Sequence, residues 1–101
     1  MNPMTTVIIM KFKVAPGREK EFEEFVAERA QTIKKTPGLE KIYLLVPLGT
    51  TEYRLVSWWD KIKDHQSWIR KESYEVSENP KHAGLVIGTI PFEVGEVRKQ
   101  W

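Results

Sequence analysis

The segment from Trp58 to Glu78 holds the residues whose types and spacing best suit binding chemistry. Three of the four tryptophans and one of the two histidines lie in it. His65 and Trp68 are three positions apart, so they share one face of a helix. Trp68 can then face Trp59 at the end of the preceding strand, and the two rings with the imidazole would form a wall for a flat aromatic ligand. The alternative is that these tryptophans serve only as core packing.

Composition limits the function classes. The 101 residues predict one domain over residues 1–101, with 41% hydrophobic and 30% charged residues. The net charge is only +2 and the charges are interspersed, which argues against a nucleic-acid binder. The chain has no cysteine, hence no disulfide and no thiolate nucleophile or metal ligand. With no signal peptide and no membrane-spanning stretch expected, we predict a cytoplasmic protein that does not contact a membrane.

The order of apolar patterns and turn residues predicts strand, helix, strand, strand, helix, strand. Pro16-Gly17 begins the first helix, Pro37-Gly38 ends it, and Asn79-Pro80 ends the second. This order predicts an α+β, ferredoxin-like βαββαβ fold, with an antiparallel four-stranded sheet and two helices on one face. The expected ranges are 7–14, 18–35, 39–48, 52–59, 60–78 and 89–99.

The first strand is apolar on both faces over half its length, although one layer of helices covers only one face of a sheet. The other face would carry Ile9, Leu45 and Val56. A second copy packed on that face would close a dimeric α+β barrel, most simply with twofold symmetry. We therefore expect a homodimer.

The sequence resembles a known family, the antibiotic biosynthesis monooxygenase domains, and within it the small haem-degrading monooxygenases. The likeness covers nearly the whole chain. The matching features are the first strand leading into Pro16–Phe22, the Pro37-Gly38-Leu39 start of the second strand, Trp59 followed nine residues later by Trp68, and the polar run Arg70–Tyr74. The family forms dimeric α+β barrels, so the resemblance implies the same fold and assembly.

The resemblance also implies a monooxygenase acting on a flat aromatic substrate, with haem, as substrate and cofactor, the first candidate. In the haem-degrading members a tryptophan on the second helix packs against the porphyrin, and Trp68 matches it. Met10 stands at the place of their first-strand asparagine, and methionine cannot donate a hydrogen bond. Their iron-binding histidine corresponds to Glu78, with His82 four residues further on. His82 is then the candidate iron ligand, and Glu78 the next one.

Other relatives oxygenate phenols or quinols without metal or cofactor, and a third alternative is a domain that binds a small ligand without turnover. In the cofactor-free reading, His65 would act as base or hydrogen-bond donor, because an imidazole pKa lies in the useful range. Across these readings the expected catalytic residues are Trp68 and His65. The expected ligand-binding residues are Met10, Phe12, Tyr43, Trp59 and Trp68.

Overall fold

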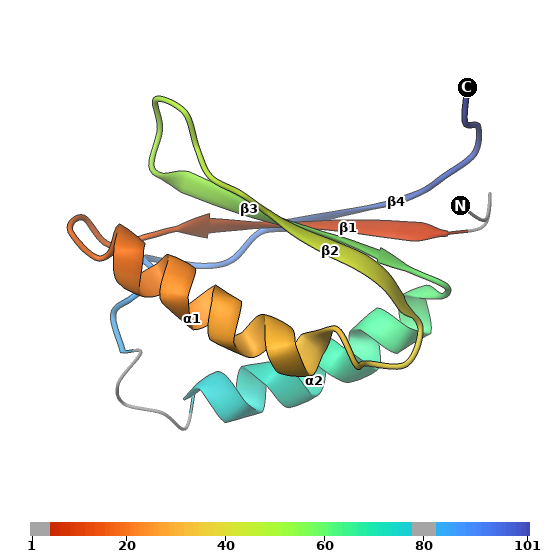
Figure 1. Cartoon of the computed structure of the whole chain (residues 1–101), viewed down its shortest axis with the longest axis horizontal. Coiled ribbons are helices and arrows are strands. Elements are labelled where there is room, and N and C mark those ends of the chain that lie inside the picture. Colours follow the sequence, from red (N-terminus) through yellow and green to blue (C-terminus); the bar gives the residue numbers. More distant parts are fainter. Residues whose placement is uncertain (1–4, 78–82) are drawn as a thin grey trace.

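The structure, a computed structural model, describes residues 5–77 and 83–101. The element order is the one the sequence predicts. Both helices lie on the same side of the sheet (Figure 1). The elements are β1 (Thr6–Lys13), α1 (Glu19–Ile33), β2 (Leu39–Leu45), β3 (Glu52–Trp59), α2 (Ile62–Ser77) and β4 (Phe92–Glu96).

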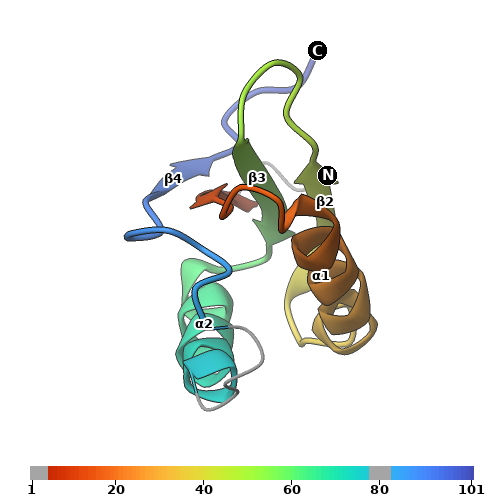
Figure 2. The same cartoon turned by 90° about the vertical axis from the view of Figure 1, so that its left-hand side faces the viewer.

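The four strands form one antiparallel sheet in the order β2-β3-β1-β4. β1 is central because its residues are apolar on both faces, and it pairs with β3 and β4. β4 is an edge strand, which is where a strand tolerates a proline such as Pro91. Just before β4 begins, the Pro91 carbonyl accepts a hydrogen bond from the Lys11 amide. Figure 2 shows α1 toward the β2 side of the sheet and α2 toward the β4 side.

Alternation along the strands separates two faces. The inner face packs on the helices, with Ile8, Met10, Leu55 and Trp59 buried together with Ile33 of α1 and Trp68 of α2. The outer face carries the opposite set of residues, and no helix of the described chain covers it (Figure 1). Its members are Val7, Ile9, Lys41, Tyr43, Leu45, Arg54, Val56 and Trp58.

Two expected strands are shorter than the sequence suggests. β2 ends at Leu45 rather than 48, and the last strand covers only Phe92–Glu96 of the expected 89–99. The segment before β4, expected as a loop, instead runs beside the end of β1. Leu85 accepts a hydrogen bond from the Ala15 amide at 2.9 Å, and the Ile87 amide donates to Lys13 at 2.7 Å. Burial of Leu85 explains this close attachment.

Gly38 fixes the turn between α1 and β2. Its φ is +85°, which L side chains rarely adopt, and a Cβ added there would overlap the side chain of Asp64. Its carbonyl accepts a hydrogen bond from the Asp60 amide at 2.8 Å. The end of α1 is thereby placed against the start of α2. No helix within residues 5–77 and 83–101 is long and apolar enough to cross a bilayer.

Candidate functional site

A cavity of about 480 Å³ lies between the inner face of the sheet and the two helices. That volume is within the usual range for small-molecule sites, about 300–1,000 Å³. Its walls come from β1, β3, both helices and the segment that leads into β4, and among the lining residues that the structure describes, Arg29 alone is charged. The lining residues are Met10, Phe12, Phe22, Phe25, Val26, Arg29, Ile33, Leu55, Trp68, Ile69, Val86, Ile90 and Phe92.

The α1 side of the cavity follows from helical spacing. Phe22, Val26, Arg29 and Ile33 recur every three or four positions, so they share one face. Arg29 therefore stands in a stripe that is otherwise apolar. A guanidinium there can pair with an anionic group on a ligand, and the exclusion of water by the apolar walls strengthens such a pair.

Beside the cavity, three rings contact one another in edge-on and tilted arrangements at the junction of β3 and α2. The ring centroids of Trp59 and Trp68 are 5.6 Å apart, and His65 lies 5.3 Å from Trp59 and 5.5 Å from Trp68. The Trp59 indole Nε1 donates to the Ser57 hydroxyl at 2.8 Å, which fixes its orientation. Trp68 is the member of this cluster that reaches the cavity.

His65 is buried, with 4% of its surface exposed. Its Nε2 has no hydrogen-bond partner in the described part of the chain. Burial lowers the pKa of His65, because a charged imidazole loses its hydration there. The imidazole is therefore neutral near neutral pH.

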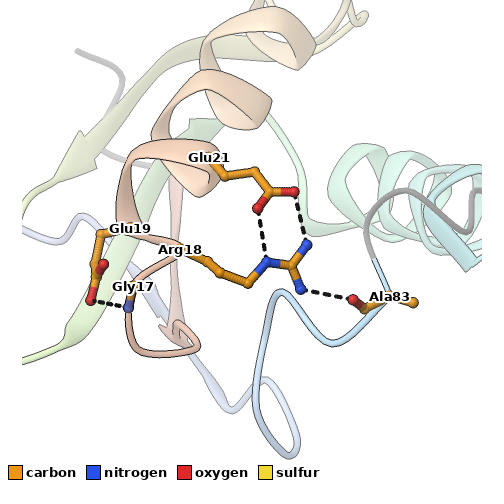
Figure 3. Close-up of polar contacts among 5 residues, drawn as sticks. All are labelled: Gly17, Arg18, Glu19, Glu21 and Ala83. Carbon is orange, nitrogen blue, oxygen red and sulfur yellow. Dashed lines mark hydrogen bonds and ion pairs between the residues drawn. The ribbon is translucent and has the colours of Figure 1, made fainter.

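Arg18 links the start of α1 to the segment that leads into β4 (Figure 3). The Arg18 Nε and Nη2 donate to the two carboxylate oxygens of Glu21, each at 2.8 Å. The Nη1 of Arg18 donates to the Ala83 carbonyl, also at 2.8 Å. This fork fixes the start of the segment whose residues Val86, Ile90 and Phe92 line the cavity.

The structure brings together some of the predicted site residues. Met10, Phe12 and Trp68 line the cavity, while Trp59 and His65 lie behind Trp68. Tyr43 does not join them. Register places it on the outer face, opposite Val56, where its ring contacts Trp58 at 5.2 Å.

Two predicted residues, Glu78 and His82, lie outside the described residues. The most informative residue that the prediction omitted is Arg29, whose signal was a lone cation within the apolar stripe of α1. Val86, Ile90 and Phe92 had no such signal, because their place depends on how the segment before β4 folds back.

The apolar walls suit a porphyrin or another flat ring system. Among the described lining residues, none is a histidine or a carboxylate that could ligate iron. The described part of the chain also has no group of three or more His, Cys, Asp or Glu residues arranged to hold a metal ion. A ligand for haem iron would thus have to come from elsewhere in the chain.

The chain is similar to solved structures over nearly its whole length. A haem-degrading protein from Mycobacterium tuberculosis, solved free of haem, is 27% identical, with a TM-score of 0.69 over 99% of this chain and 98% of its own. A second structure of that protein, MhuD, with two haems bound in its active site, is 25% identical, with a TM-score of 0.73 over 95% of this chain and 98% of its own. SnoaB, a cofactor-independent oxygenase from Streptomyces nogalater, is 18% identical, with a TM-score of 0.76 over 96% of each chain, and shows the fold alone.

No curated protein matches the chain. Residues 5–80 match the family described as antibiotic biosynthesis monooxygenase, a range that includes β1 through α2 and most of the cavity wall. The chain belongs to the antibiotic biosynthesis monooxygenase family.

Proposed function

We propose that this protein is a monooxygenase that binds a flat aromatic substrate in the cavity beneath the sheet, with haem the first substrate to test. The observation that carries the proposal is an apolar cavity of about 480 Å³ with Trp68 in its wall and one cation, Arg29. A flat aromatic ring with an anionic substituent would meet both the apolar walls and the cation. The cavity offers a matching surface for each part.

The lining residues have different roles in binding the substrate. Met10, Phe12 and Trp68 contact the ring system, and Trp59 backs Trp68. Arg29 pairs with a carboxylate or phenolate on the substrate. The apolar walls reduce contact of the bound ring system with water, which limits hydrolysis of reactive intermediates.

Haem is favoured by the two haem-degrading structures at 25% and 27% identity, which cover nearly the whole chain. Haem, when bound, would supply the iron that activates dioxygen, with electrons from an external donor. His82 is the proposed iron ligand and lies outside the described residues. Arg29 would then pair with a propionate.

A second candidate, cofactor-free oxygenation of a phenol or quinol, is favoured by a different observation. The described lining offers no imidazole or carboxylate to iron, whereas it does offer Arg29 to a phenolate. In that reading the cation stabilises the deprotonated substrate, and no iron ligand is required. His65 would handle the proton only if Trp68 moved aside, because it lies behind that ring.

Titration of the purified protein with haemin tests the two candidates. Haem degradation predicts a sharp Soret shift at one haem per chain, followed by bleaching when a reductant is added in air. A shift without bleaching would indicate binding without turnover. With no shift at all, haem is excluded and the cofactor-free reading becomes the one to test, by oxygen uptake with quinols. Arg29→Gln should weaken either ligand, and Gln31→Asn, exposed on the same helix, is the matched control.

We also propose that the protein works as a homodimer closed through the outer face of the sheet. Val56 is buried, yet Tyr43 and Leu45 beside it are about half exposed, at 52% and 49%. A continuous apolar face of this kind is typical of an interface between subunits. The cytoplasmic location expected from the sequence stays a prediction.

A further inference from the structure

His65 occupies a position where its protonation state affects the cavity wall. Its ring is edge-on to Trp59, at an interplanar angle of 73°, and tilted by 52° to Trp68. Trp68 in turn lies between His65 and the cavity, since it alone of the three rings lines the cavity. Any change that displaces the imidazole therefore also moves the ring that a ligand would contact.

The surroundings of His65 suit only its neutral form. Its Nε2 is buried without a partner in the described chain, so a proton added there would have no acceptor. No nearby carboxylate compensates, because burial is the only cause of the lowered pKa of His65. The described charged residues near the three rings in sequence are exposed, except for Asp64, which is half-buried; they are Asp60, Lys61, Lys63, Asp64 and Arg70. On the neighbouring elements Glu40, Glu96 and Lys34, which lie beside the strand partners of Trp59 or next to Ile33 of the same core cluster, are exposed as well.

We propose that the neutral imidazole of His65 positions Trp68 in the cavity wall, so that ligand binding in the cavity is lost when His65 takes up a second proton. His65 is thus a positioning residue that acts through Trp68. Protonation favours conformations in which the imidazolium reaches water, away from the contact with the two indoles. Trp68, three residues along the same helix, loses its support when that happens.

The size of the effect follows from the fraction of neutral His65. Below its folded pKa, that fraction falls about tenfold for each pH unit. If only the neutral form binds ligand, the apparent Kd rises by the same factor. The apparent Kd should therefore be constant near pH 7 and rise steeply in the acid range, at a midpoint below about 6.5.

Binding of Nile red, an uncharged apolar dye, tests this independently of catalysis and of the natural substrate. Fluorescence titrations between about pH 7.5 and about pH 4.5 should give a Kd that rises toward acid pH for the wild-type protein, by up to about tenfold for each pH unit below the folded pKa of His65. His65→Phe keeps an aromatic ring in the cluster and cannot titrate, so its Kd should stay within about twofold over the same range. A matched control adds Gln66→His to His65→Phe. That exposed imidazole should not restore the pH dependence.

The proposal is overturned if the wild-type Kd does not change with pH, or if His65→Phe keeps the wild-type pH profile. Should His65→Phe not fold, NMR of the wild-type protein decides instead. The ring-proton signals of His65 must then titrate at the midpoint of the dye-binding curve, and separate midpoints would contradict the coupling. These outcomes leave the proposed oxygenase function untouched, because loss of turnover with intact dye binding would count against that function alone.

Discussion

Trp68 is the residue that most directly links the fold to the cavity, because it contacts Trp59 and also lines the cavity. Trp68→Phe should keep the fold, since a phenyl ring still fills most of the space. It should raise the Kd for haemin about three- to tenfold, through loss of aromatic contact worth about 0.5–1.5 kcal/mol. Haemin titration together with thermal unfolding measures both effects. Loss of the fold, rather than of binding, would support the alternative that Trp68 serves only as core packing.

His65 also makes a prediction about stability. Because its pKa is lowered by folding, the unfolded chain binds more protons than the native state between the folded pKa and about 6.5. The neutral imidazole therefore makes its full contribution to the free energy of unfolding above about pH 6.5. That contribution is lost as the pH falls through the folded pKa. Urea unfolding at several pH values should show a steeper acid decline for the wild type than for His65→Phe. If the free energy of unfolding declined equally with falling pH in both proteins, the prediction would be refuted.

At the scale of elements, Arg18 joins the start of α1 to the segment that forms the far wall of the cavity (Figure 3). Arg18→Gln should speed amide hydrogen exchange at residues 84–88, because the Ala83 carbonyl loses its donor. Global stability should change little, since the Arg18–Glu21 pair is partly exposed. Lys20→Gln, exposed on the same turn of helix, is the control. Unchanged exchange in Arg18→Gln would show that the backbone bonds of Leu85 and Ile87 hold the segment alone.

Alanine substitutions at Gly38 and Gly49 distinguish the cost of backbone strain from the cost of side-chain crowding. Both have φ near +85°, at +85° and +88°, but only at Gly38 would a Cβ meet another group, the side chain of Asp64. Gly49→Ala should cost only the backbone strain, about 1–2 kcal/mol. Gly38→Ala should cost that amount plus the displacement of Asp64 and of α2. Chemical denaturation of both variants gives the comparison, and equal losses would mean that Asp64 moves aside freely.

The elements could be predicted from the sequence because local signals and tertiary packing agree. Apolar residues alternate along β1 and β3 and form a stripe along α1, and these patterns determine which faces of the strands and of the helix are buried. The predicted ferredoxin-like fold is confirmed. The site could be predicted only in part. Tyr43 shares the outer face with Leu45, and counting by twos along β2 excludes it from the cavity side. The contribution of Val86 and Ile90 depends on non-local hydrogen bonds to β1, which no local pattern encodes.

At the scale of the whole molecule, only one of the two faces of the sheet is covered by helices. Helices cover the inner face of the sheet, and no helix of the described chain covers the outer face (Figure 2). On that outer face Leu45 is exposed, Val7 and Ile9 are half-buried, and Val56 is buried. Aromatic groups extend this surface, with the Lys41 Nζ 4.4 Å from the centroid of Trp58. A second copy would bury this surface on both partners, in an interface of the size found in stable dimers, on the order of 2,000 Å².

Ile9 lies near the middle of that face, paired with Val56 on one side and Glu93 on the other. Ile9→Asp would place a carboxylate in the apolar layer between two subunits, at a cost of several kcal/mol. We therefore expect the variant to dissociate or unfold, whereas Gln31→Asp, exposed on α1, should leave the assembly intact. Sedimentation equilibrium at micromolar concentration measures the mass of each. If the wild-type protein sediments as a single 11.8 kDa species, the outer face is exposed in solution and the proposed dimer does not form.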